Sequence, residues 1–291
     1  MINIALPTQK LQDWLTQQWV ILKGKPVDIA TENWLLAPFG NLGVIGENFI
    51  EQLAENENLK VQRKTSSGLL KTINDLSLLE KELERLATEV IDFYEHTAQY
   101  QLGFSIRWNP LFKGFGSLVN LLYSNRIQQL YLPTRNLKKD EKISSELIQL
   151  VDKQSKRVVY TIWLRTFIDT KKVIYSGIYS TCRLPSGKVC IKAVFPLPQG
   201  NATVIMKPSV DDKGALTLDS SGKKFGDAGF YFVLKDKNEK TWATYIQSFQ
   251  DRLTIHFRHN KLYAEQRLHL WRQQVLQMNY SIKLTNSRST D

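Results

Sequence analysis

A short segment in the first half of the chain brings several reactive side chains within one turn of a helix. The sequence Asp92-Phe-Tyr-Glu-His-Thr97 contains two carboxylates, an imidazole and a phenol. Asp92 and His96 are four residues apart, so a helix places them on one face, where the carboxylate can orient the imidazole of a general base. Tyr94 can supply a proton from the same turn. We therefore take His96, Asp92 and Tyr94 as the catalytic candidates if the protein is an enzyme.

The competing interpretation is a solvated charge pair on a helix surface. Pairs at this spacing are common on exposed helices, and the segment contains no nucleophile. A serine hydrolase would need a G-x-S-x-G elbow. The nearest match, Gly177-Ile-Tyr-Ser180, lacks the second glycine and lies in a predicted strand. The sequence therefore leaves catalysis open and favours a protein that is not an enzyme.

The histidines and cysteines form no motif for a metal or a cofactor. His256, His269 and Glu265 resemble a metal-binding set in residue type, but their spacing is not diagnostic of one. Cys182 and Cys190 are separated by seven residues, which does not match a zinc finger. We expect no metal and no cofactor. Because the N-terminus carries no export signal, we expect two reduced thiols in a cytoplasmic protein.

The elements that position these residues are predicted to be helices in the first half of the chain. Apolar residues recur there every three or four positions in three places, and each place predicts a helix with one buried face. The predicted buried faces are Leu11, Trp14, Leu15, Trp19 and Leu22 in residues 8–22, Phe49, Ile50, Leu53 and Ala54 in a short helix, and Leu79, Leu83, Leu86, Val90, Phe93 and Thr97 in a longer one. The longer helix starts at a predicted capping box, Ser77 to Glu80, and ends before Gly103. A further helix is predicted over residues 117–129.

The second half of the chain shows the alternation that is typical of strands. From Ile143 onwards, alternating apolar and polar residues are interrupted by turn signals such as Pro185-Ser-Gly187, which predicts an antiparallel meander. One hairpin can be given a register, because His259-Asn260 fits a two-residue turn. In that register Phe257 faces Leu262 across the two strands.

The charge changes at the same point as the hydrophobic period. Residues 1–140 carry 15 Lys/Arg and 15 Asp/Glu, whereas residues 141–291 carry 24 and 13, so the second half accounts for the net charge of +11. We predict an α+β fold, with N-terminal helices packed on a large curved antiparallel sheet that forms a meander or a partial barrel. The helical, charge-neutral region is residues 1–140 and the basic β region is residues 141–291. We expect both regions to form one integrated domain.

Six blocks of sequence are distinctive when they are taken together. They are Asp92-Phe-Tyr-Glu-His-Thr97, Trp108-Asn-Pro, Arg126-Ile-Gln-Gln-Leu-Tyr-Leu-Pro133, Tyr175-Ser-Gly-Ile-Tyr-Ser-Thr181, Val194-Phe-Pro-Leu-Pro and Phe225-Gly-Asp-Ala-Gly-Phe-Tyr231. In this combination the chain resembles an uncharacterised bacterial protein family of about this length, a domain of unknown function, from about Trp34 to Tyr280. The resemblance implies a bacterial, cytoplasmic protein, and it brings no activity or mechanism with it.

The aromatic residues of the predicted sheet indicate a ligand-binding protein. An aromatic-rich, concave sheet covered by helices is a frequent way to enclose an apolar ligand. We expect the protein to bind a hydrophobic or lipid-like small molecule, with Tyr175, Phe230, Phe232 and Trp242 at the ligand-binding site. Other apolar sheet positions are Tyr160, Ile162, Ile191, Phe195 and Ile255. The alternative is that all these residues simply fill a core.

Two further functions remain open. One is an enzyme that acts on an apolar substrate through Asp92 and His96. The other is a membrane-peripheral protein that contacts anionic lipid through a basic sheet face formed by Arg252, Arg258, Lys261 and Arg267. No apolar run reaches the roughly 18 residues that a membrane span needs. Nucleic acid is not an expected partner, because the lysines are scattered among acidic residues and no recognition motif is present.

Overall fold

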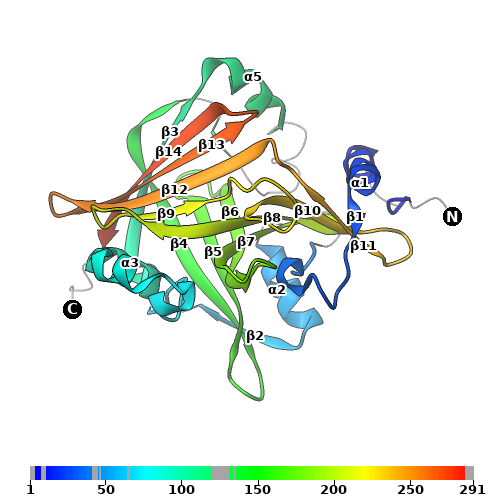
Figure 1. Ribbon diagram of the computed structural model, residues 1–291, viewed down its shortest axis with the longest axis horizontal. Coiled ribbons are helices and arrows are strands. Elements are labelled where there is room, and N and C mark those ends of the chain that lie inside the picture. The colour runs from blue at the N-terminus through cyan, green and yellow to red at the C-terminus, as the bar shows by residue number, and fades with distance from the viewer. Residues whose placement is uncertain are drawn as a thin grey trace.

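Antiparallel strands dominate the computed structural model, which describes residues 4–7, 11–40, 45, 47–63, 66–119, 132–133 and 136–285. Ten of these strands close into a barrel (Figure 1). In their order around the ring they are β3 (Tyr100–Trp108), β4 (Leu137–Asp152), β5 (Val158–Phe167), β6 (Val173–Arg183), β7 (Val189–Leu197), β8 (Gly200–Val210), β9 (Leu216–Asp219), β12 (Phe249–Arg258), β13 (Lys261–Leu270) and β14 (Gln273–Leu284). The ring closes because β14 pairs with β3.

Strand β8 divides one of its edges between two partners. Residues 207–210 pair with β9 and complete the ring, whereas residues 200–205 pair with β10 (Gly229–Lys235). Strands β11 (Thr241–Tyr245) and β1 (Lys25–Pro26) extend this side sheet beyond β10. A further strand, β2 (Leu59–Arg63), pairs with the end of β4. The barrel and the side sheet therefore share one strand.

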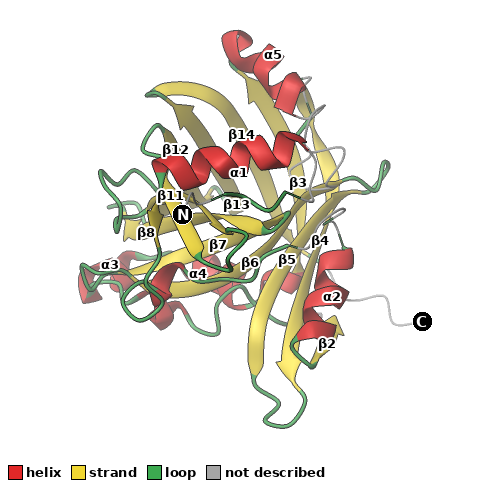
Figure 2. Cartoon of the chain, turned by 90° about the vertical axis from the view of Figure 1, so that its right-hand side faces the viewer, coloured by secondary structure: helices red, strands yellow, loops and turns green. Residues whose placement is uncertain are grey.

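Short helices cover the sheet in several places (Figure 2). Helix α1 (Leu11–Lys23) packs on β10 and β11, and α2 (Asn48–Asn56) covers the outer face of β4 and β5. The 3-10 turn η1 (Asn33–Leu35) lies against β6, and α5 (Pro110–Val119) follows β3.

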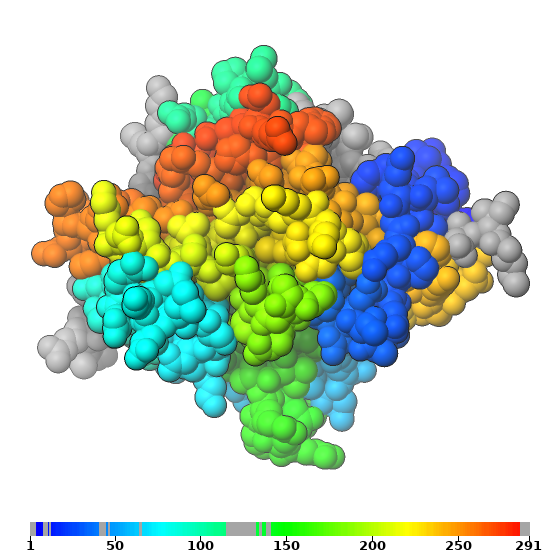
Figure 3. Space-filling model, viewed as in Figure 1, coloured from blue at the N-terminus to red at the C-terminus, as the bar shows by residue number. Residues whose placement is uncertain are grey.

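Residues 66–99 form what we call the cover segment. It contains η2 (Ile73–Leu76), α3 (Glu80–Arg85), α4 (Thr88–Glu95) and η3 (Thr97–Gln99). Its buried apolar residues belong to the same cluster as the barrel interior. Figure 3 shows part of this segment, in cyan, lying against the barrel strands. The segment therefore covers the barrel and contributes to its core.

Alternating apolar residues fill most of the barrel interior. On β3, the inward side chains of Leu102, Phe104, Ile106 and Trp108 are buried, while residues 101 and 107, on the other face of the strand, are exposed. Burial of each such side chain stabilises the fold by roughly 1.5–3 kcal/mol. The barrel interior is therefore the main core of the fold, and the cover segment adds to it.

The predicted α+β fold, with N-terminal helices packed on a sheet, is wrong. Strand makes up 48% of the chain and helix 20%, and the sheet closes on itself. Strand β3, which joins β4 to β14, lies where we predicted the end of a long helix at Gly103. The reason is that residues 100–108 alternate with period two, a pattern that the helical stripe just before them obscures.

The long helix predicted from residue 77 is also wrong, because it is broken into α3 and α4. Leu86 and Ala87 lie between them in extended geometry, with ψ of 127° and 132°. The N–H of Ala87 donates to the carbonyl of Gly214 in the turn between β8 and β9 (3.2 Å). A tertiary hydrogen bond thus replaces a helical one. The predicted capping box at Ser77 and Glu80 is wrong as well: Ser77 ends η2, which has its own capping box at Thr72 and Asp75, and at the start of α3 the N–H of Leu79 donates to Glu82.

Helix α1 is present, but its buried face differs from the predicted one. Leu11 and Leu22, which we predicted to be buried, are 70% and 75% exposed. Gln17 and Val20 are buried instead, and the Gln17 amide donates to the carbonyl of Pro198 (2.8 Å). The apolar stripe of this helix therefore faces away from the core.

Other local predictions are confirmed. The predicted short helix is α2, and Phe49, Ile50, Leu53 and Ala54 are its buried residues. The β12–β13 hairpin has the predicted register, with Phe257 opposite Leu262. Its turn residues His259 and Asn260 both have positive φ, 51° and 56°, as a type I′ turn requires. The helix predicted over residues 117–129 lies outside the described residues beyond residue 119.

Candidate functional site

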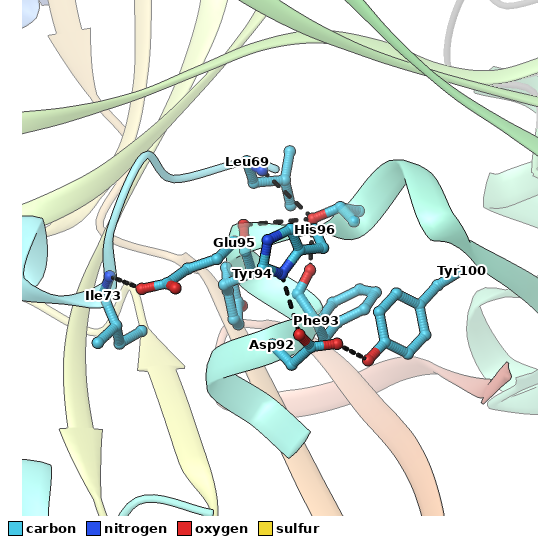
Figure 4. A network of polar contacts seen from close by, with 9 residues as sticks. Leu69, Ile73, Asp92, Phe93, Tyr94, Glu95, His96 and Tyr100 are labelled. Atoms are coloured by element: carbon cyan, nitrogen blue, oxygen red, sulfur yellow. Dashed lines mark hydrogen bonds and ion pairs between the residues drawn. The ribbon is translucent and has the colours of Figure 1, made fainter. Parts of the chain in front are cut away.

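Asp92 and His96 form the hydrogen bond that their spacing predicts (Figure 4). Oδ1 of Asp92 lies 2.9 Å from Nδ1 of His96, and the hydroxyl of Tyr100 donates to Oδ2 of the same carboxylate. The side chains of Asp92 and His96 are 48% and 43% exposed. Neither of the two cavities described below is lined by them. The pair therefore lies at the surface, without a described cavity beside it.

Tyr94, the third catalytic candidate, is buried in the barrel cluster. It is 3% exposed and lines the interior cavity. Burial raises the pKa of its hydroxyl far above the ordinary value, so the phenol stays neutral. The structure therefore separates Tyr94 from the exposed His96.

The other polar residues of this segment hold the cover segment together. The Glu95 carboxylate accepts a hydrogen bond from the backbone N–H of Ile73 (2.7 Å) (Figure 4). The Thr97 hydroxyl donates to the carbonyl of Phe93 (2.6 Å) and accepts from the N–H of Leu69 (3.2 Å). These contacts tie the start of the cover segment to α4, so the segment is fixed by polar contacts as well as by packing.

The four aromatic residues that we predicted at a ligand site lie in different environments. Tyr175 is inside the barrel and 7% exposed. Phe230 and Phe232 contact each other on β10, with ring centroids 5.0 Å apart. Trp242 packs beneath α1 and donates its Nε1–H to Asp236 (3.0 Å). Phe230 and Phe232 pack against the cluster that contains Tyr175, but none of the four residues lines either of the two cavities described below.

An interior cavity of about 50 Å³ lies within the barrel. Its wall comes from the cover segment and from strands around the ring. Its apolar lining includes Leu70, Phe93, Leu102, Trp163, Ile191, Met206, Ile255 and Ala264. Such a volume holds a few small atoms or one or two water molecules. A larger ligand requires the surrounding side chains to move.

One residue of this wall is a buried arginine. Arg165, on β5, is 6% exposed. Its guanidinium lies over the rings of Trp163 (4.2 Å) and Tyr175 (4.6 Å), and Nη2 donates to the hydroxyl of Tyr179 (3.3 Å). Nε has no hydrogen-bond partner, and no ion pair among the described residues includes this side chain. Because a guanidinium stays protonated in proteins, the barrel holds a positive charge that no anion pairs.

A buried carboxylate on β12 interacts with this arginine without forming an ion pair. Asp251 is 7% exposed, and its Oδ2 accepts from the amide of Gln266 (2.7 Å). Gln266 in turn accepts from the hydroxyl of Tyr280 (3.3 Å). Burial raises the pKa of Asp251 to about 7, against the opposing effects of Gln266 and Arg165. The carboxyl is therefore partly protonated near neutral pH, and its Oδ1 has no hydrogen-bond partner.

The tyrosines around Arg165 are neutral. Burial is the largest effect on Tyr175, Tyr179 and Tyr280, and it raises the pKa of each hydroxyl, that of Tyr280 to about 12. Neutral phenols can donate hydrogen bonds to an anion but cannot neutralise a cation. The site around Arg165 therefore combines one fixed positive charge with neutral hydroxyls, of which that of Tyr280 already donates to Gln266.

A second and more open cavity, of about 430 Å³, lies beside Tyr160 and Lys192. Lys192 is buried, and its ammonium donates to the carbonyls of Trp34 (3.2 Å) and Leu36 (2.9 Å). Burial lowers the pKa of this lysine. Its donors are thus engaged by the backbone. Tyr179 lines this cavity as well as the interior one.

Sequence reasoning missed Arg165 and Asp251. Strand β5 carries apolar residues on both faces, and Tyr160 and Ile162 lie on the outer one, which α2 covers. The inner face carries Trp163 and Arg165. An arginine two positions after a tryptophan, in a strand that is apolar on both faces, is the signal that could have identified it.

The basic face that we predicted on the β12–β13 hairpin contains ion pairs. Arg252 pairs with Asp219, and Arg267 pairs with Glu265 (2.6 Å between N and O).

None of the described helices is long and apolar enough to cross a membrane. In the part of the chain that the structure describes, no three His, Cys, Asp or Glu residues gather into a group that could hold a metal ion.

The fold and the interior site together define an antiparallel β-barrel protein with an apolar interior and a buried cation. No family model matches the sequence, and no solved structure matches it either. The chain is similar to the uncharacterized membrane protein YndJ of Bacillus subtilis (strain 168), with 26% identity over 270 residues, which cover 92% of this chain and 46% of YndJ. The chain thus spans about half the length of this curated relative. The predicted resemblance to uncharacterised bacterial proteins is confirmed to this extent.

Proposed function

We propose that the protein binds a hydrophobic, lipid-like small molecule inside its barrel. The observation that carries this proposal is the interior cavity with its mainly apolar wall. Closed antiparallel barrels are among the folds whose interiors hold small ligands. Each Å² of apolar ligand surface that leaves water contributes roughly 25 cal/mol to binding. The name of YndJ connects a similar sequence with membranes, which agrees with a lipid-like ligand.

A ligand of more than a few atoms enters the barrel only if part of the wall moves, because the cavity measures about 50 Å³. The cover segment is the part of the wall that can move, once the polar contacts of Glu82, Arg85 and Ala87 with residues 210–214 are broken. It contributes Leu70 and Phe93 to the cavity wall, yet none of the residues of α3 is buried. Its internal hydrogen bonds at Glu95 and Thr97 favour movement of α4 and the preceding residues together.

The enzymatic alternative gains no support from the Asp92–His96 pair. A general base must lie within reach of a bound substrate, and His96 lines neither described cavity. Binding without catalysis is therefore the function that we propose.

Titration with a fluorescent fatty-acid probe tests this proposal. The full-length protein should bind the probe with a Kd in the micromolar range or below. Ala264→Leu adds bulk to the cavity wall, so it should leave less room for the ligand and weaken binding at least about tenfold. The same overpacking also costs roughly 1–3 kcal/mol of stability. Trp242→Phe, outside the barrel, is the matched control and should bind as the wild type does. Absence of probe binding by the folded wild-type protein, or equal binding by Ala264→Leu, would contradict the proposal.

A further inference from the structure

The barrel interior contains a cation that forms no ion pair with a described residue. A charged group that is removed from water is costly unless a counter-charge and hydrogen bonds compensate it. Arg165 is 6% exposed and lies in the cavity wall, with Nε unpartnered and without an ion pair among the described residues. The two aromatic rings that flank the guanidinium cover its faces, at 4.2 Å and 4.6 Å. They compensate only part of the desolvation.

We infer that Arg165 binds the carboxylate of an amphiphilic ligand, so that the ligand class is a monocarboxylate with an apolar tail, such as a long-chain fatty acid. This inference rests on the proposed function, because it places the headgroup of the same ligand. The planar guanidinium offers parallel N–H donors that match the two oxygens of a carboxylate. Nε–H has no partner and can donate to one oxygen, and Nη2, which also contacts Tyr179, has a second hydrogen. The guanidinium also has a side-chain hydrogen bond with Tyr280, which a bound carboxylate can replace.

The surroundings favour one negative charge over two. One fixed cation compensates one anion. Asp251 is buried in the same interior with its pKa raised to about 7, so it can take up a proton when a monocarboxylate binds, whereas a dianion would leave a second negative charge uncompensated. Most of the remaining wall is aliphatic or aromatic, which suits a hydrocarbon tail. A phosphate monoester, with its higher charge, fits this balance less well.

The test compares two probes that share one tail and differ in the headgroup. Oleate and oleyl alcohol are titrated into the delipidated full-length protein by calorimetry, with oleyl phosphate as a third probe. The wild type should bind oleate at least about tenfold more tightly than the alcohol, because hydrogen bonds to charged groups are the stronger ones. Arg165→Gln should remove this preference, so that the variant binds oleate and oleyl alcohol with equal affinity. Arg252→Gln, an exposed arginine outside the cavity wall, is the matched control and should keep the preference.

Each outcome has a defined meaning. Equal binding of oleate and oleyl alcohol by the wild type overturns the inference and leaves the proposed function in place. Binding of none of the probes by the folded wild type overturns the proposed function as well. Tighter binding of oleyl phosphate than of oleate overturns the monocarboxylate class. If Arg165→Gln does not fold, Tyr179→Phe keeps the charge and removes the hydroxyl that Nη2 contacts. It should change the ratio of the oleate affinity to the alcohol affinity, and the same ratio as in the wild type would count against the site.

Discussion

Arg165 and Asp251 are both buried in the barrel, and burial has a different consequence for each of them. Arginine cannot release its proton in a protein, so its charge must be compensated by its surroundings. A carboxylate can take up a proton, and burial therefore raises the pKa of Asp251 to about 7. The aspartate is thus the group of this pair whose charge changes near neutral pH.

This difference predicts a pH dependence of stability. The pKa of Asp251 is about 7 in the folded protein and 3.8 as its ordinary value, so the folded state holds this proton more tightly. The resulting stabilisation is complete below about pH 4 and is lost as the pH rises through about 7, with a total of up to about 4 kcal/mol. Asp251→Asn should remove this dependence. Urea unfolding measures the free energy of unfolding of both proteins at pH 5 and pH 8. Relative to the wild type, the variant should be more stable at pH 8 than at pH 5. A difference in stability that is the same at both pH values would contradict the raised pKa of Asp251.

At the scale of elements, the cover segment depends on one buried threonine. Thr97 is 1% exposed and joins the N–H of Leu69 to the carbonyl of Phe93. Thr97→Val keeps the shape and leaves a buried N–H unpaired, which should cost about 1–3 kcal/mol of stability. Hydrogen exchange should show faster exchange of the Leu69 amide. The exposed Thr88→Val is the control in the same segment, and an equal effect of both substitutions would argue against this role.

The β12–β13 turn gives a second prediction at this scale. Asn260 has a φ of 56°, a conformation that a β-branched residue adopts only with strain. Asn260→Val should lower the free energy of unfolding by about 1–2 kcal/mol. Asn260→Gly should lower it by no more than a few tenths, because glycine adopts positive φ readily. Denaturant unfolding measures both changes, and equal stabilities for the two variants would contradict the turn geometry.

Local sequence patterns predicted some elements of this fold correctly and others wrongly. Period-two alternation and turn residues such as His259 and Asn260 predicted the strands after residue 143, because these signals are local. Closure of the barrel was not predictable, because it depends on β3 and on pairings between residues far apart in the sequence. The candidate site was missed for a related reason. Both faces of β5 are apolar, and only the position of α2 shows which one is outside.

At the scale of the whole molecule, the predicted basic face carries less unpaired positive charge than its basic residues indicate, although the net charge of the chain is +11. Arg252 and Arg267 are neutralised by neighbouring carboxylates. We therefore expect only weak attachment to anionic vesicles, lost at physiological salt because screening there acts over about 8 Å. Cosedimentation at low and physiological salt measures this. Strong binding that persists at physiological salt and is lost in Arg258→Glu would favour the membrane-peripheral function instead.

Strand β8 belongs to both the barrel and the side sheet, and this affects how the molecule unfolds. Residues 207–210 of β8 pair with β9 in the barrel, and residues 200–205 pair with β10 in the side sheet. Unfolding of the barrel or of the side sheet therefore exposes backbone groups of the other. Melting should therefore be cooperative, as a single calorimetric peak in which the van't Hoff and calorimetric enthalpies agree. A protease cut in the exposed turn at residues 237–239 should leave two fragments that stay associated until the whole protein melts.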